Sequence, residues 1–192
     1  MTGRASSGAP GLRRAVFLDR DGVLNRALLK EGKPCPPATL AEFELLPGVP
    51  EACARLKAAG LLLIVVTNQP DVGRGTMTRE TVEAIHARLT ALLPIDRVEV
   101  SYDSGREQPP SEFRKPRPGM LYRAAQDLGI ELTRSFMVGD RWRDIDCGHA
   151  AGCTTFLIDY SYQESLRCPP DFRVKDLGEC ADHILRLCDE TR

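Results

Sequence analysis

The chain has 192 residues, of which 42% are hydrophobic and 28% are charged, and its formal net charge at pH 7 is -1. This length suits one domain with a core of its own, and this composition is typical of a soluble globular protein. A net charge so close to zero argues against a nucleic-acid-binding protein, which usually has a strong basic excess. The sequence has no apolar run near the roughly 18 residues of a membrane helix, so no membrane partner is expected.

The first 13 residues, MTGRASSGAPGLR, are small and polar and lack the apolar stretch of a secretory signal. They predict a disordered tail, followed by a single domain over residues 14–192. The seven cysteines are odd in number and form no C-x-x-C pair, which favours free thiols in a reducing cytoplasm. We therefore expect a cytoplasmic protein that is a monomer or a weak dimer.

Short apolar runs alternate along the chain with segments of helical periodicity. The apolar runs predict strands at residues 15–18, 61–66, 97–102, 136–138 and 154–158. The other segments predict helices at residues 49–59, 78–93, 118–128, 143–151 and 177–187. This alternation predicts an α/β fold of three layers, with a Rossmann-like parallel sheet flanked by helices, because parallel neighbours need crossover connections. Residues 26–47 and 103–117 are expected to form long loops, and no large cap domain is predicted.

Polar side chains follow three of the predicted strands. Asp19 and Asp21 come after the first strand and Asp140 after the fourth. Thr67 and Asn68 follow the second strand and offer a hydroxyl and an amide that suit phosphate oxygens. Ligands of open α/β sheets bind beyond the carboxyl ends of the strands, so we expect these side chains to meet there.

The paired carboxylates of Asp19 and Asp21 need compensation. Side chains alternate along an extended chain, so both aspartates can face one side while Arg20 faces the other. Two carboxylates a few ångströms apart repel, and a cation or a proton must offset the repulsion. Lys115 lies in the cationic run RKPRP at residues 114–118. Acids, a hydroxyl and a lysine fit Mg²⁺ bound by oxygen ligands beside a phosphate, whereas softer metals would need cysteine or histidine here.

Four stretches, DRDGVLN, TNQ, RKPRPGM and MVGDRWRDID, resemble in order the four motifs of the haloacid dehalogenase (HAD) superfamily of phosphohydrolases. The resemblance covers about residues 14–160. It is strongest to the branch of D-glycero-D-manno-heptose-1,7-bisphosphate 7-phosphatase and histidinol-phosphate phosphatase. The resemblance implies a HAD-like fold and a Mg²⁺-dependent phosphomonoesterase that acts through a phosphoaspartate. The implied substrate is a small phosphorylated sugar, heptose 1,7-bisphosphate, cleaved at its 7-phosphate.

The resemblance also implies roles for individual residues. Asp19 would attack phosphorus, and Asp21 would act first as acid and then as base. Mg²⁺ would be bound by Asp19, the backbone carbonyl of Asp21, and Asp140. Thr67 and Lys115 would complete the catalytic set, and Asp144 would support the metal or Lys115. The residues implied to bind or lie near the substrate are Arg20, Asn25, Asn68, Gln69, Arg74 and Arg114.

The chain departs from this branch in the loop before the RKP motif. Many members have a zinc site there, with a C-x-H after the third strand and a C-x-C ahead of the arginine. In this chain Ser111 and Phe113 stand at the C-x-C positions, and residues 102–104 contain no C-x-H. Tetrahedral zinc needs about four thiolate or imidazole ligands, so no structural zinc is predicted. We expect the loop at residues 103–113 to be floppier, or to be restrained by Pro109 and Pro110.

Two other interpretations stay open. Because the loop shapes substrate access, its departure leaves histidinol phosphate or another small phosphomonoester as an alternative substrate. A non-enzymatic alternative is a receiver-like phosphoacceptor, which also combines acids, a hydroxyl, a lysine and Mg²⁺ on a parallel sheet. Such domains lack a second acid two residues after the first, so Asp21 favours the phosphatase.

Overall fold

The computed structural model describes residues 12–30, 33–162 and 164–190. Its centre is a sheet of six parallel strands in the order β5-β4-β1-β6-β7-β8. The strands are β1 (Ala15–Leu18), β4 (Leu62–Asn68), β5 (Arg97–Ser101), β6 (Phe136–Gly139), β7 (Thr154–Ile158) and β8 (Phe172–Val174). The predicted α/β fold with a parallel sheet is therefore confirmed.

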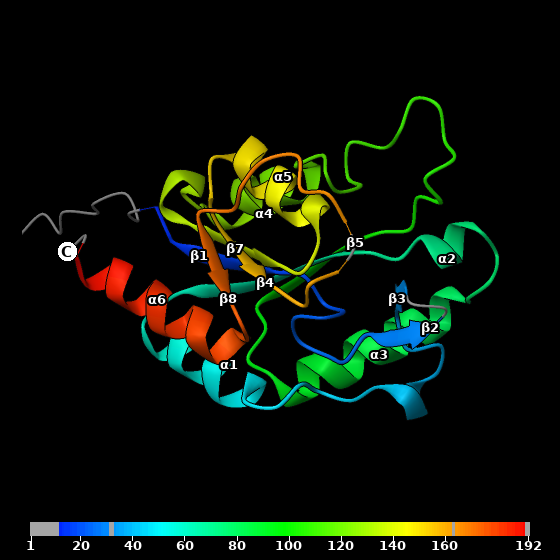
Figure 1. Ribbon diagram of the computed structural model, residues 1–192, viewed down its shortest axis with the longest axis horizontal. Coiled ribbons are helices and arrows are strands. Elements are labelled where there is room, and N and C mark those ends of the chain that lie inside the picture. Colours follow the sequence, from blue (N-terminus) through cyan, green and yellow to red (C-terminus); the bar gives the residue numbers. More distant parts are fainter. Residues whose placement is uncertain (1–11, 31–32, 163, 191–192) are drawn as a thin grey trace, which may run out of the picture.

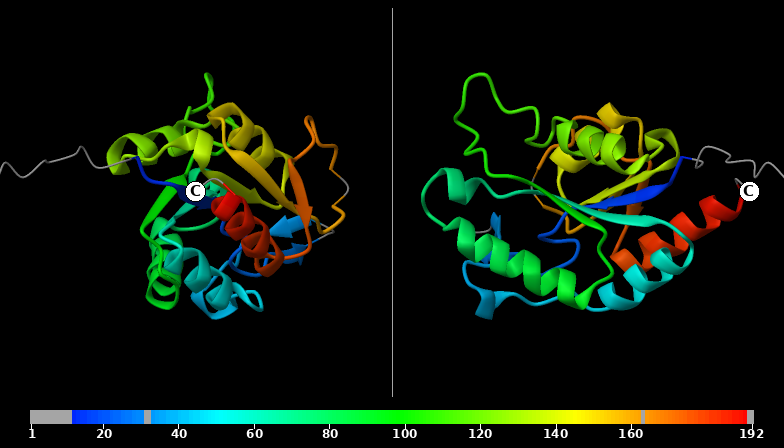
Figure 2. Two further views of the ribbon diagram at one scale, coloured as in Figure 1. Left: turned by 90° about the vertical axis from the view of Figure 1, so that its left-hand side faces the viewer. Right: turned by 180° about the vertical axis from the view of Figure 1, so that it is seen from behind.

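Helices cover both faces of the sheet and complete the three layers (Figures 1 and 2). One face carries α1 (Val49–Ala58), α3 (Arg79–Leu92) and α6 (Leu177–Glu190), and the other carries α4 (Gly119–Leu128) and α5 (Trp142–Ala151). No helix in the described part of the chain is long and apolar enough to cross a membrane.

The central strand β1 shows why its sequence is apolar at every position. Val16 and Leu18 belong to the hydrophobic core shared with α1 and α6. Ala15 and Phe17 belong to the second core, which contains residues of α4 and α5. All four side chains are fully buried, because alternate side chains of a strand with helices on both sides meet one core or the other.

The strand order reverses at β1, and this reversal positions the site. The chain runs outward from β1 through β4 to β5, and then returns to the other side of β1 to form β6, β7 and β8. Leu18 is in register with Val65 of β4 and with Val138 of β6. The residues that follow these three strands therefore emerge at one level, at the switch point where open α/β sheets bind ligands.

Short elements are the part of the secondary structure that the sequence did not reveal. They are the hairpin β2 (Leu28–Lys30) and β3 (Lys33–Cys35), strand β8, helix α2 (Pro70–Gly73) and the 3₁₀ turns Leu40–Glu42 and Leu132–Arg134. These elements have only three or four residues, and none is apolar throughout, unlike the apolar runs that predict β1 and β6. The predicted loop at residues 26–47 therefore contains a hairpin and a turn.

The predicted tail at residues 1–13 lies almost wholly outside the described residues. Arg13 is an exception, because its backbone N–H donates to the Gly129 carbonyl at 2.8 Å and its carbonyl accepts from Glu131 N at 2.8 Å. The chain is thus attached to the segment after α4 one residue before the expected start of the domain.

Candidate active site

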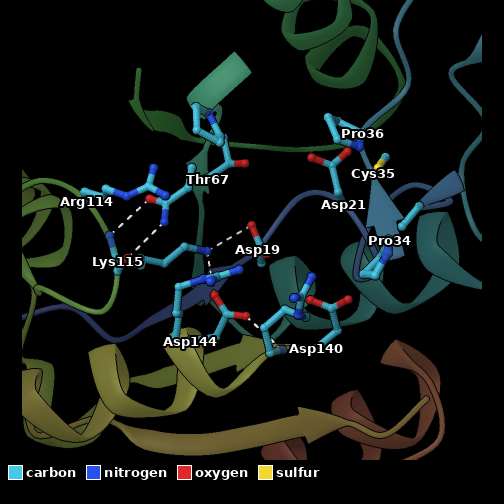
Figure 3. A pocket seen from close by; sticks show the side chains of 15 residues that line it. Asp19, Asp21, Pro34, Cys35, Pro36, Thr67, Arg114, Lys115, Asp140 and Asp144 are labelled. Atoms are coloured by element: carbon cyan, nitrogen blue, oxygen red, sulfur yellow. Dashed lines mark hydrogen bonds and ion pairs between the residues drawn. The ribbon is translucent and has the colours of Figure 1, made fainter. Parts of the chain in front are cut away.

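A buried lysine lies at the centre of the site (Figure 3). Lys115 Nζ is 2.9 Å from Asp19 Oδ1 and 2.6 Å from Asp144 Oδ1, and it donates to the Val66 carbonyl at 2.7 Å. Its side chain is only 2% exposed. Burial lowers the pKa of Lys115, but the carboxylates of Asp144 and Asp19 outweigh this effect and leave the pKa above its ordinary value. The lysine is therefore a fixed positive charge that binds the end of β1 to α5.

Three carboxylates next to this lysine could bind a metal ion. Asp19, Asp140 and Asp144 each offer an oxygen, and the three oxygens lie within 4.8 Å of one another. Burial raises the pKa of Asp140 well above its usual range, and repulsion from Asp19 and Asp144 adds to the shift. Burial also raises the pKa of Asp19 to about 6, against the attraction of Lys115. The positive charge of one lysine is thus too small to stabilise all three acids in their ionised form.

The surroundings of Asp140 favour a cation in this cluster. Its Oδ1 is buried and has no hydrogen-bond partner among the described residues, a costly state for a carboxylate oxygen. A hard divalent ion with oxygen ligands, such as Mg²⁺, would satisfy it. Asp19, Asp140 and Asp144 are the side chains that would hold the ion.

Two glycines make room for these acids. Gly22 has φ +86°, and a Cβ atom on it would lie 2.3 Å from Asp140 Oδ2. At Gly139 a Cβ atom would lie 2.1 Å from the Cβ of Asp144. Both distances are far below van der Waals contact, so any larger residue would displace an acid of the cluster. The glycines that follow the acid pair and end β6 are therefore required by the packing of the carboxylates.

Asp21 is oriented by a separate group of side chains. Arg20 contacts both of its oxygens, with Nη2 2.9 Å from Oδ2 and Nε 3.2 Å from Oδ1. Asn25 Nδ2 donates to Oδ1 at 2.9 Å, and Gln69 Nε2 donates to Oδ2 at 2.8 Å. Among the side chains expected near the substrate, Arg20, Asn25 and Gln69 are buried behind Asp21 and do not line the pocket. Their observed contact is with the carboxylate of Asp21.

The guanidinium of Arg20 is fully buried and reaches α3. Its Nη1 lies 3.3 Å from His86 Nε2. Burial lowers the pKa of His86 to about 4, and the positive charge of Arg20 acts in the same direction. His86 is therefore neutral near pH 7, and its ring nitrogen can accept a hydrogen bond from Arg20 without adding a second positive charge.

Asn68 and Thr67 occupy the end of β4, and both line the pocket. The amide of Asn68 bonds to both backbone groups of Lys115, donating to its carbonyl at 3.0 Å and accepting from its N–H at 3.0 Å. Thr67 Oγ1 accepts from Gln69 Nε2 at 2.9 Å. The amide predicted near phosphate is thus used, in this structure, to fix the backbone of the lysine.

The pocket above the acids is lined by cations and by the β2–β3 hairpin. Arg114 lines it, and its Nη1 donates to the Asp103 carbonyl at 2.7 Å. Arg74 does not line the pocket and donates through Nε to the Ser104 carbonyl at 3.1 Å. The sequence analysis did not single out Arg143, which lines the pocket from α5. It also missed Pro34 and Cys35 of β3 and the adjacent Pro36. The available signal for Arg143 was the RWRD stretch at residues 141–144, which ends at Asp144.

Mg²⁺ is expected to stabilise the folded protein in a pH-dependent way. Asp19 has an ordinary pKa of 3.8 and a folded pKa of about 6, so this group makes the metal-free protein less stable as pH rises through that interval. A metal ligand must be deprotonated, so the increase in melting temperature with Mg²⁺ should be larger at about pH 7.5 than at about pH 5. Differential scanning fluorimetry with EDTA or Mg²⁺ measures this. Asp140→Asn should show no Mg²⁺ effect, and an undiminished shift in that variant would contradict the assigned site.

A pair of glycine variants separates backbone strain from damage to the acid cluster. Gly22→Ala and Gly48→Ala both place alanine at positive φ, at about 1–2 kcal/mol of stability each. Only Gly22→Ala collides with Asp140, because no atom lies within 4 Å of a Cβ at Gly48. We expect Gly22→Ala alone to lose the Mg²⁺-dependent rise in melting temperature. Equal Mg²⁺ responses in the two variants would show that the Gly22–Asp140 contact does not govern metal binding.

The comparisons with known proteins agree with this geometry. A family model described as "HAD-hyrolase-like" matches residues 112–180. The chain is 34% identical to the D-glycero-D-manno-heptose-1,7-bisphosphate 7-phosphatase of Thermosynechococcus vestitus, over 90% of this chain and 95% of that protein. It is 37% identical to the D-glycero-alpha-D-manno-heptose-1,7-bisphosphate 7-phosphatase of Burkholderia mallei, over 76% of this chain and 79% of that protein.

Solved structures give the same result. The D,D-heptose 1,7-bisphosphate phosphatase of B. bronchiseptica, in complex with magnesium and phosphate, superposes with a TM-score of 0.77 and 27% identity, over 90% of this chain and 98% of that one. The D,D-heptose 1,7-bisphosphate phosphatase of Burkholderia thailandensis has a TM-score of 0.62 and 27% identity, over 90% and 99%. The chain therefore belongs to the haloacid dehalogenase superfamily, in the branch of the heptose bisphosphate phosphatases, and is a phosphoric monoester hydrolase.

Proposed function

We propose that this enzyme is a Mg²⁺-dependent phosphatase that removes the 7-phosphate of D-glycero-D-manno-heptose 1,7-bisphosphate through a phosphoaspartate on Asp19. The observation that carries the proposal is the cluster of Asp19, Asp140 and Asp144 around Lys115, beside an oriented Asp21. The names of the relatives support the choice of sugar.

Asp19 has one oxygen available for attack on phosphorus. Lys115 Nζ and the backbone N–H of Arg20 both bond to its Oδ1, at 2.9 and 2.8 Å. Oδ2 accepts no hydrogen bond from the described residues. In the first step Oδ2 forms a bond to phosphorus, and the bond from phosphorus to the sugar oxygen breaks. Lys115 keeps the nucleophile in place and offsets part of the charge of the incoming phosphate.

Asp21 is the proton carrier of the proposed reaction. It gives a proton to the leaving sugar oxygen, and in the second step it takes a proton from the water that attacks the phosphoaspartate and releases phosphate. Its bonds to Arg20, Asn25 and Gln69 fix the position from which it does so. The bound Mg²⁺ would supply charge neutralisation between Asp19 and the phosphate.

Two arginines at the pocket favour a bisphosphate over histidinol phosphate. Arg114 and Arg143 line the same pocket as Asp19. Within the described residues, Arg114 bonds to a backbone carbonyl and Arg143 packs over the Trp142 ring at 5.4 Å, and neither forms a salt bridge. Guanidinium groups without a carboxylate partner suit a second phosphate. Histidinol phosphate has no second phosphate to offer.

We also propose that residues 14–192 form one domain, and that the enzyme acts in the cytoplasm as a monomer or weak dimer. The seven free cysteines support a reducing compartment. Five of them lie in the interior: Cys53, Cys147, Cys153, Cys180 and Cys188. Burial raises the pKa of the first four.

Phosphate release from a substrate panel tests the function. The panel holds both anomers of heptose 1,7-bisphosphate, histidinol phosphate and other small phosphomonoesters, each with and without Mg²⁺. We expect the highest kcat/KM for a heptose bisphosphate and no turnover in EDTA. A higher kcat/KM for histidinol phosphate would replace the proposed substrate and leave the phosphatase chemistry intact.

Asp19→Asn tests the phosphoaspartate. It should lower kcat by about a thousand-fold or more, because the amide is not a nucleophile. Asp182→Asn is the matched control, since Asp182 lies on α6 outside the pocket in an exposed ion pair with Arg55. Wild-type rates from Asp19→Asn would end the proposal. A stable phosphoprotein without turnover in the wild type would instead indicate a phosphoacceptor.

A further inference from the structure

The loop between β5 and α4 has an internal order that the sequence did not suggest. It contains no strand or helix and extends past the end of the sheet (Figure 1). The carboxylate of Glu107 accepts three successive backbone N–H groups, those of Ser104 at 3.0 Å, Gly105 at 2.9 Å and Arg106 at 3.0 Å. Successive N–H groups that converge on one anion form a backbone nest, and here the loop supplies its own anion.

Asp103 joins the two arms of the same loop. Its Oδ1 accepts from Gly105 N at 2.7 Å, and its Oδ2 accepts from Ser111 N at 2.9 Å. Gly105 allows the turn because its φ is +82°. Two carboxylates therefore accept all of these backbone donors, in a segment where residues 103–113 offer no cysteine or histidine.

The turn at residues 103–105 also contacts the guanidinium of Arg114. Arg114 Nη1 donates to the Asp103 carbonyl at 2.7 Å. A Cβ atom on Gly105 would lie 3.0 Å from Arg114 Nη2, so the turn packs directly on the guanidinium. Arg74 bonds to the next carbonyl, that of Ser104, at 3.1 Å. The conformation of the turn therefore fixes where Arg114 lies at the edge of the pocket.

The charges of Asp103 and Glu107 also act on Arg114. Burial lowers the pKa of Arg114, and the positive charges of Arg143 and Arg74 act in the same direction. Asp103 and Glu107 oppose these effects. The guanidinium groups of Arg74 and Arg143 therefore repel that of Arg114, and the two acids of the loop reduce this repulsion although neither lines the pocket.

We infer that Asp103 and Glu107 are positioning residues: their hydrogen bonds to the backbone order the turn that holds Arg114 against the non-transferred phosphate of the substrate. The inference rests on the proposed function, because Arg114 contacts that phosphate only if the substrate is a bisphosphate. In this inference, two carboxylates order a loop that has no thiolate or imidazole to bind a metal. Specificity for the second phosphate then depends on residues that do not touch it.

Amide hydrogen exchange tests the loop directly and needs no substrate. In wild-type protein with EDTA, the amides of Ser104, Gly105, Arg106 and Ser111 should be protected. Asp103→Ala and Glu107→Gln should each raise their exchange rates by about ten-fold, since each variant loses charge-assisted hydrogen bonds. Glu112→Gln is the matched control, because it removes the same charge from the same loop at an exposed side chain that accepts no hydrogen bond from the described residues.

Kinetics test the link to Arg114. Asp103→Ala should raise KM for heptose 1,7-bisphosphate by about ten-fold and keep kcat within about two-fold of the wild-type value. p-Nitrophenyl phosphate has no second phosphate. The rise in KM for the bisphosphate should therefore be at least about five-fold larger than the rise for p-nitrophenyl phosphate. Unchanged exchange in both variants, or an equal rise in KM for both substrates, overturns the inference. So does wild-type protein that contains one zinc per chain and loses protection of these amides in EDTA.

The two proposals fail in different ways. A wild-type protein that releases phosphate from no ester overturns the proposed function and, with it, the role given to Arg114. A wild-type protein that is active on the bisphosphate, with an Asp103→Ala variant unchanged in exchange and in KM, overturns only the inference about the loop.

Discussion

The structure depends above all on the placement of one buried ammonium group. Lys115 is 2% exposed, and its Nζ contacts a carboxylate after β1, a carboxylate on α5 and a backbone carbonyl of β4. A lone buried cation would be costly, and so would either carboxylate without it. The lysine therefore ties three segments of the fold together, and the amide of Asn68 fixes its backbone from β4. Fold stability and site geometry have the same origin here.

The acids at the strand ends could be predicted from the sequence, because an apolar run followed by polar residues is enough to locate them. An apolar run followed by Asp19, Asp21 and Gly22 places acids at a carboxyl edge in any parallel sheet, and Asp140 follows β6 in the same way. The collision that a side chain at Gly22 would cause with Asp140 could not be predicted from the sequence, because the two residues follow different strands. Register across β1 and β6 creates that contact.

Contacts between distant segments account for what the sequence did not show. Alternation along the chain put Arg20 on the face opposite Asp19, but only the fold shows its guanidinium turned back to Asp21 and paired with His86 of α3. The order of the loop at residues 103–113 was likewise hidden, because composition shows prolines and polar residues, whereas Asp103 acts through the backbone of Ser111. Strand β8 was missed because Arg173 interrupts its apolar residues, whereas the equally short β1 is apolar throughout.

Charge balance explains why the site would take a divalent ion. Asp19, Asp140 and Asp144 bring three negative charges when ionised, and Lys115 offsets one of them, which leaves a deficit of two. The raised pKa values of Asp19 and Asp140 reflect this deficit. A monovalent ion would leave the cluster short of positive charge. A divalent ion balances the charge of the cluster. It can contact the phosphate that is transferred, but it leaves no excess positive charge for a second phosphate. Any second phosphate must therefore find its positive charge elsewhere. Arg114 and Arg143 line the pocket and form no salt bridge with a carboxylate of the described residues, so they can supply that charge.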